Sequence, residues 1–133
     1  MPMITDVILD YLQTRGIGTV GTDLFNGFLP AAPNKAAAVF LYGGSTTDTK
    51  RGYTEPRLNF RVRDTIETTA YDFAWDIYNQ LHGLHNITLQ GISIISCKGI
   101  QSEPQTTGRD EQERSTFSVN FELRIRKATR YSV

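Results

Sequence analysis

The stretch from 115 to 127 constrains the fold most, because its residues alternate strictly between apolar and polar. Its apolar positions are Phe117, Val119, Phe121, Leu123 and Ile125. Side chains of a strand alternate between the two faces of a sheet, so the pattern predicts one long strand with an apolar face and a solvated face. Residues 57–63 repeat it, with arginine and asparagine between Leu58, Phe60 and Val62. Such alternation is typical of an antiparallel sheet covered on one face only.

Two other segments carry the spacing of amphipathic helices, with apolar residues three and four positions apart. The first predicts a helix over residues 6–15, with Thr5 as its N-cap and Gly16 as its stop. The second predicts a helix that follows Asp64, the first residue of a variant capping box, and ends at Gly83.

The remaining segments predict the rest of the sheet and its connections. Residues 36–42 are continuously apolar, which is typical of a strand buried on both faces. Residues 86–97 read as one strand whose alternation changes phase at Gly91, which predicts a β-bulge. The polar segment 43–56 is predicted to be a long loop, and the polar segment 101–114 a long hairpin tip.

We therefore predict a single α+β domain over residues 1–133, with an antiparallel sheet of four to five strands and two helices packed on one face. A chain of this length can bury a core without disulfides, and the lone Cys97 cannot form an internal one. We see no basic leader followed by an apolar run and no apolar stretch of about 20 residues, so we expect a soluble, intracellular protein. Fourteen basic and fourteen acidic residues cancel, so bulk charge favours neither a nucleic-acid nor a membrane partner.

Candidate chemistry is weak throughout the chain. The G-x-G-x-x-G spacing of residues 16–21 follows a predicted helix instead of a strand, so we reject a dinucleotide cofactor. His82 and His85, even with Asp76 and Cys97, do not make a convincing set for a closed metal site, which needs about four ligands. We predict no catalytic residue, no cofactor and no metal. A hydrolase or metalloenzyme built on the two histidines and Asp76 is a third hypothesis behind the two developed below.

Basic residues gather on the polar faces of the two alternating strands and in the predicted loop just before the first of them. They are Lys50, Arg51, Arg57, Arg61 and Arg63, followed by Arg124, Arg126 and Lys127. Aromatic rings beside such a patch could stack with bases, but Phe60, Phe117 and Phe121 lie on the opposite face. Zero net charge also removes most of the counterion-release term that drives nucleic-acid binding. We therefore favour acidic groups on another protein, such as the second helix of a neighbouring copy, over nucleic acid.

The order and pattern of several segments resemble the small minor capsid or tail-terminator proteins of long-tailed bacteriophages, over roughly residues 4–127. The segments that carry the resemblance are Ile-Thr-Asp-Val-Ile-Leu-Asp-Tyr-Leu from Ile4, Gly-Thr-Asp-Leu-Phe-Asn-Gly-Phe-Leu-Pro from Gly21, Pro-Arg-Leu-Asn-Phe-Arg-Val-Arg from Pro56, Tyr-Asp-Phe-Ala from Tyr71, and Gly-Arg-Asp from Gly108 before Ser-Thr-Phe-Ser-Val-Asn-Phe.

The resemblance implies a structural virion protein of the head–tail junction, made in the host cytoplasm during assembly. Such subunits form a ring, commonly of six copies, that stops polymerisation of the tail tube and presents a surface for joining the head. The implied partners are copies of the chain, the major tail-tube protein and a head-completion or connector protein, with genomic DNA passing through the ring without sequence readout. The alternative is a nucleic-acid-binding module that uses the arginine-rich sheet face.

This family has no short functional motif, so the expected contact residues follow from predicted loops and charge. Tyrosine and arginine are the residue types most often important at interfaces. We expect interface contacts at Lys50, Arg51, Tyr53, Arg61, Arg109, Asp110, Glu113 and Arg124.

Overall fold

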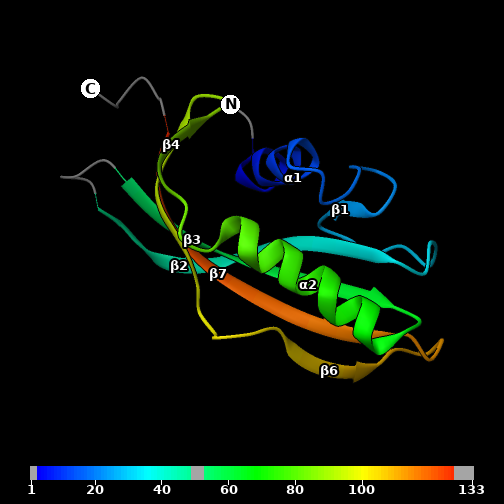
Figure 1. Cartoon of the computed structure of the whole chain (residues 1–133). Helices are drawn as coiled ribbons and strands as arrows, with labels where there is room; N and C mark the ends of the chain where they lie inside the picture. The colour runs from blue at the N-terminus through cyan, green and yellow to red at the C-terminus, as the bar shows by residue number, and fades with distance from the viewer. Residues whose placement is uncertain (1–2, 49–52, 128–133) are drawn as a thin grey trace.

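The computed structural model describes residues 3–48 and 53–127, in which two helices cover one face of a curled sheet (Figure 1). In chain order the elements are α1 (Ile4–Thr14), β1 (Leu24–Asn26), β2 (Ala36–Asp48), β3 (Tyr53–Asp64), α2 (Glu67–Leu81), β4 (His85–Leu89), β5 (Ile92–Gly99), β6 (Gln105–Arg109) and β7 (Ser115–Lys127). The strands lie in the order β1-β2-β3-β7-β5-β4, and β6 also pairs with β7.

The α+β class is confirmed, but the predicted sheet of four to five antiparallel strands is wrong. The sheet has seven strands, and β1 runs parallel to β2 while the other pairs are antiparallel. One difference is that the single strand predicted over 86–97 is two strands, β4 and β5. The others are short: β1 has three residues, and β6 has five, all exposed. Neither is long enough, or buried enough on one face, to carry the alternation that identifies a strand in a sequence.

The long alternating strand is confirmed as β7, which spans the same residues as the sequence pattern. Its inward side chains oppose those of β3, so that Val119 pairs with Phe60 and Phe121 with Leu58. Phe60 and Phe121 are fully buried and meet edge to face, with ring centroids 5.8 Å apart. These contacts form the centre of the core, between the sheet and the helices.

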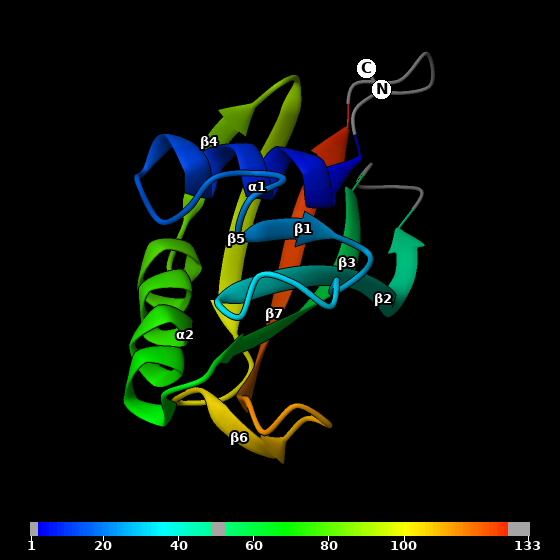
Figure 2. The ribbon, with the colours of Figure 1, turned by 90° about the vertical axis from the view of Figure 1, so that its right-hand side faces the viewer.

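Both helices pack on this apolar face, as predicted, and Figure 2 shows them together on one side of the sheet. The buried stripe of α2 is Ala70, Phe73, Ala74, Ile77, Tyr78 and Leu81. Positive φ angles at Gly16 (80°) and Gly83 (92°) follow the two helix ends, which agrees with the predicted stops.

The predicted N-caps are wrong in both helices. The first helix begins at Ile4, which places Thr5 inside it. The buried Thr5 hydroxyl has no hydrogen-bond partner in the described part of the chain. In α2 the N-cap is Ile66, with no side-chain cap. The Asp64 carboxylate accepts a hydrogen bond from the neighbouring Thr65 N–H, before the helix starts. A capping pattern in the sequence does not fix which residue adopts the capping conformation, because burial of the apolar stripe sets the helix position.

Two connections differ from the predictions. Strands β2 and β3 continue into the predicted loop 43–56, with Ser45 paired to Glu55 across a register shift. The phase change at Gly91 is a hairpin turn instead of a bulge: Gln90 and Gly91 both have positive φ (50° and 83°), and Leu89 pairs with Ile92. The hairpin predicted over 101–114 is formed by β6 and β7.

The prediction that residues 36–42 are buried on both faces holds for 36–39 only, because Leu41 and Tyr42 are exposed. Ala37 and Val39 join the main core, whereas Ala36 and Ala38 form a small second cluster with Phe25 on the other face. Residues 27–35, here called the strap, connect β1 to β2 beside that second cluster. Among the described residues, no helix is both long enough and apolar enough to cross a membrane.

Candidate functional site

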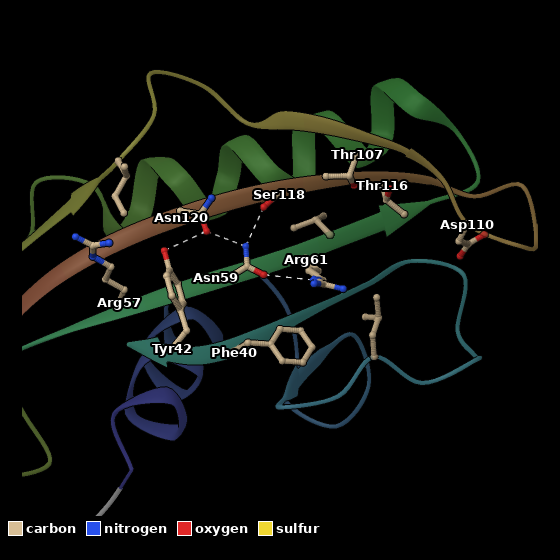
Figure 3. Close-up of a pocket in the computed structure, with 13 residues that line it drawn as sticks. Phe40, Tyr42, Arg57, Asn59, Arg61, Thr107, Asp110, Thr116, Ser118 and Asn120 are labelled. Atoms are coloured by element: carbon tan, nitrogen blue, oxygen red, sulfur yellow. Dashed lines mark hydrogen bonds between the residues drawn. The ribbon is translucent and has the colours of Figure 1, made fainter. Parts of the chain in front are cut away.

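The sheet face opposite the helices holds a groove of about 910 Å³ that crosses β2, β3 and β7 (Figure 3). The strand register builds its floor, because Phe40 of β2 pairs with Asn59 of β3, which in turn pairs with Asn120 of β7. Leu29 of the strap, Thr107 of β6, and Ile100 and Asp110 of the connecting segments also line it. Every strand of the floor therefore sends its outward side chains into one concave surface.

Amide and hydroxyl groups bond to one another along the floor. Asn59 donates hydrogen bonds to Ser118 Oγ (2.8 Å) and Asn120 Oδ1 (2.9 Å). Tyr42 donates to the same Asn120 oxygen at 3.4 Å, and Asn120 donates to Gln101 Oε1 at 3.1 Å. This network fixes the side chains of three strands in one arrangement, which gives the groove a preformed polar surface.

Two arginines supply the positive charge of the groove. Arg61 is exposed, lies over the Phe40 ring with 5.4 Å to the centroid, and donates to Asn59 Oδ1 at 3.4 Å. No carboxylate of the described residues forms an ion pair with it. Arg57 Nη2 lies 3.8 Å from Glu122 Oε2, and its buried Nε has no hydrogen-bond partner within the described part of the chain. The cation available to a partner is therefore that of Arg61.

Two buried arginines anchor the strap at the edge of the groove. Arg63 is 3% exposed and donates to the carbonyls of Pro30, Pro33 (2.8 Å) and Asn34 (3.3 Å). Burial, and secondarily the charge of Arg114, lower the pKa of Arg63. These hydrogen bonds explain how a cation on the predicted solvent face comes to be buried: it satisfies strap carbonyls that would otherwise lack partners.

Arg114 is the second anchor. It donates to the Ala31 carbonyl at 2.7 Å and to Asp110 Oδ2 at 2.7 Å. Asp110 also accepts the backbone N–H of Arg114 (3.0 Å) and of Gln112 (2.9 Å). The Arg114 backbone hydrogen bond is the largest cause that lowers the pKa of Asp110, and the Arg114 side chain and Gln112 add to it against a smaller opposing effect of burial. The β6–β7 turn and the strap are thus fastened to each other.

The structure brings together only part of the predicted contact set. Arg61 and Asp110 line the groove, whereas Arg109 and Glu113 are exposed in the adjacent β6–β7 hairpin. Arg124 lies further along β7, with its Nη2 3.8 Å from Glu55 Oε1. Lys50 and Arg51 lie outside the described residues, and Tyr53 is described only as a backbone position at the start of β3.

Sequence reasoning missed Phe40, Tyr42, Asn59, Ser118 and Asn120 as site residues. Asn59, Ser118 and Asn120 could have been identified, because the polar positions of the alternating strands predict which side chains share a face. The rings of Phe60, Phe117 and Phe121 are buried in the core, as predicted. The inference that the arginine face lacks aromatic rings is wrong, because Phe40 and Tyr42 enter that face from β2, whose register the sequence did not specify.

The candidate reactive residues serve structural contacts. His82 Nδ1 accepts the Gly99 N–H at 2.9 Å, and the His82 ring stacks on Tyr78. His85 Nδ1 lies 3.0 Å from the Gly83 carbonyl oxygen. Burial raises the pKa of Cys97 to about 12, which makes its thiol a poor nucleophile at neutral pH. Within residues 3–48 and 53–127, no three His, Cys, Asp or Glu side chains gather in a way that could hold a metal ion.

The sequence from residue 11 to residue 127 matches the family described as bacteriophage tail terminator protein. The chain belongs to this family. The match covers all strands and α2, and it confirms the resemblance inferred from the sequence. Family membership identifies the chain as a structural protein of the phage tail.

A solved structure supports the fold assignment. The chain is similar to one in the structure titled "Virion of native gene transfer agent (GTA) particle", with a TM-score of 0.65 and 14% sequence identity. The similarity covers 92% of this chain and 93% of the other. Because the two sequences are only 14% identical, this similarity shows that the two chains share a fold and nothing further. No curated protein sequence matches the chain.

Proposed function

We propose that this chain, acting as one tail-terminator-like domain, forms a ring at the head-proximal end of a phage tail tube. The ring ends polymerisation of the tube and offers the surface on which the head is joined. The observation that carries this proposal is the family match, which runs through nearly the whole described chain. No bond is made or broken in this function, so we infer that the protein is not an enzyme.

The proposed mechanism is geometric. Identical copies joined by heterologous contacts close into a ring when each contact rotates the next copy by the right angle. Docked on the last tube ring, such a closed ring presents no surface that accepts a further tube subunit. We propose six copies, the major tail-tube protein below, a head-completion or connector protein above, and genomic DNA passing through the lumen without sequence readout. Assembly takes place in the host cytoplasm.

The β2–β3 hairpin supports a role in docking, because it extends beyond α2 at the left of Figure 1. A paired, projecting hairpin can reach a neighbouring protein without disturbing the core that carries it. We propose that this hairpin, together with Tyr53 at the start of β3, contacts the tube or the head partner. Lys50 and Arg51, which lie outside the described residues, are proposed as contacts from their position in the sequence between β2 and β3. Arg109 and Glu113, in the β6–β7 hairpin, are proposed as further contacts.

Nucleic-acid binding by the arginine face is the alternative, and charge pairing argues against it. Arg57 and Arg124 each have a carboxylate at 3.8 Å, and Arg63 is buried under the strap. These interactions reduce the charge that could neutralise phosphates, and with it the electrostatic drive for binding.

Electron microscopy of particles that lack this protein tests the proposal. Tails longer than those of the wild type are expected, because nothing stops the tube. Tails of normal length detached from full heads would instead indicate a joining protein of the same fold. Normal, attached tails would refute both roles. Light scattering after size-exclusion chromatography measures the oligomeric state of the purified protein. Because such a ring can form only when it docks on the tube, the length and attachment of the tails decide between the roles.

A further inference from the structure

Two surfaces on opposite sides of the sheet carry opposite charge. One is the polar groove with Arg61, and Figure 3 shows it with α2 behind the sheet. The other is a stripe along the outer side of α2, here called the α2 ridge, made of the exposed residues Thr68, Asp72, Asp76 and Asn79. Glu67 and Thr69, in the first turn of α2, are exposed beside it. A ring of identical copies needs two such different patches, since each copy must contact one neighbour on either side.

The charges of the α2 ridge are not balanced within the copy that carries them. Asp72 and Asp76 stand one helical turn apart, so their carboxylates repel each other. No ion pair within the described residues includes either of them. Trp75 lies between Asp72 and Asp76 in the sequence and is half-buried, so it adds aromatic surface beside the α2 ridge. A cation from outside would relieve the repulsion.

The groove offers that cation in a matching setting. Arg61 is exposed and has no ion-pair partner among the described residues. Along the same groove Tyr42 and Ile100 are 39% and 50% exposed, and they offer the tyrosine ring and an aliphatic side chain. Tyrosine, tryptophan and arginine are the residue types that most often dominate interface energies. The groove and the α2 ridge thus complement each other in both charge and apolar surface.

We propose that the α2 ridge of one copy docks in the polar groove of the next, with Arg61 between Asp72 and Asp76 of its neighbour. This inference rests on the proposed ring. Two other acidic segments fit the groove less well. Asp6 and Asp10 of α1 already accept side-chain hydrogen bonds from Asn26 and Gln90 within the same copy. The turn at 110–113 is the second. Asp110 of the receiving copy already lines that end of the groove, and a second acidic turn there would meet like charge.

Cysteine exchange between two variants tests the contact directly. Arg61→Cys protein and Asp72→Cys protein are mixed on tail tubes and, separately, in concentrated solution, and then oxidised mildly. Cys97 is buried, so it does not compete. A disulfide-linked dimer that contains one copy of each variant is expected. Dimers of one variant alone, or no dimers in either setting, would overturn the proposal.

Charge reversal tests whether the contact drives assembly. Arg61→Glu, and separately Asp72→Lys with Asp76→Lys, should each reduce the fraction of capped tubes by roughly tenfold or more, because like charges then face each other. Combining all three changes restores opposite charges and should restore capping. Asp10→Lys is the matched control, an exposed acid on α1 outside the α2 ridge, and should leave capping unchanged.

The two experiments separate the contact from the function. If wild-type protein caps tubes but the mixed dimers and the rescue are absent, the contact is wrong and the terminator function stands. If wild-type protein does not cap tubes, the proposed function fails, and the cysteine exchange in solution still decides whether copies meet through these two surfaces.

Discussion

Replacing Arg114 by methionine removes the guanidinium that fastens the strap while keeping an apolar side chain of similar length. Arg114 is 4% exposed, and within the described residues its side chain donates two hydrogen bonds of 2.7 Å, to Asp110 and to the Ala31 carbonyl. Leu29, on the same strap, lines the polar groove. The substitution therefore tests both the stability of the domain and the origin of the groove wall.

The size of the effect follows from the bonds that are lost. A hydrogen bond to a charged group contributes about 1.5–3 kcal/mol, so two give roughly 3–6 kcal/mol as an upper bound. Asp110 keeps its backbone hydrogen bonds and is about a quarter exposed, and water can reach part of the site. We therefore expect the free energy of unfolding to fall by about 2–3 kcal/mol.

Urea denaturation followed by circular dichroism measures this loss. At a slope of about 1–3 kcal/mol per molar urea, the midpoint should fall by roughly 0.7–3 M with the slope unchanged. Arg109→Met is the matched control, because Arg109 is exposed and donates a single hydrogen bond, to the Glu113 carbonyl, within the same turn. The reasoning is refuted if Arg114→Met costs less than about 1 kcal/mol or no more than the control.

Three further predictions concern a glycine, a carboxylate and the alternative function. Gly99→Ala should cost about 1–3 kcal/mol in urea denaturation, because a Cβ there would lie 2.3 Å from Tyr78 Cε2; Gly43→Ala, where a Cβ meets nothing within 4 Å, is the control. The pKa of Asp110 is lowered from 3.8 in the folded protein, so its contribution is present above pH 3.8 and is lost as pH falls through the lower folded value. The stability difference between wild type and Asp110→Asn should therefore shrink below about pH 4, and a constant difference from pH 6 to pH 2 would contradict this. DNA retention should be weak at low salt and unchanged by Arg61→Ala, whereas tight, steeply salt-dependent binding would favour the nucleic-acid alternative.

The central sheet could be predicted because burial on one face imposes a pattern on the sequence. Residues 115–127 form β7 as expected, and the stripe from Ala70 to Leu81 is the buried face of α2. Each of these segments places its buried apolar side chains on one surface. Folding 115–127 as a helix, or 70–81 as a strand, would expose about half of those side chains.

Segments without a buried face escaped the same reasoning. The end of the β2–β3 hairpin and β6 are made mostly of polar residues and glycine, so no periodicity separates a paired strand from a loop. The change of phase at Gly91 is real, but it marks a two-residue turn between β4 and β5 instead of the predicted bulge. A bulge and a two-residue turn both shift the alternation, and only the pairing of Leu89 with Ile92 distinguishes them.

The candidate site was harder to predict than the fold, because it depends on register between strands. Arg61 was identified from charge, but its position over Phe40 and beside Asn59 follows from how β2 pairs with β3. The burial of Arg63 depends on a strap that carries no pattern of its own. Long-range pairing and irregular backbone therefore determine which of the predicted cations can meet a partner.

The place of β7 in the sheet has a consequence for synthesis. It is synthesised after the other six described strands, yet β3 pairs with one of its edges and β5 and β6 pair with the other. A nascent chain released before Ser115 lacks the strand that joins these elements, so its remaining pieces cannot close a common core.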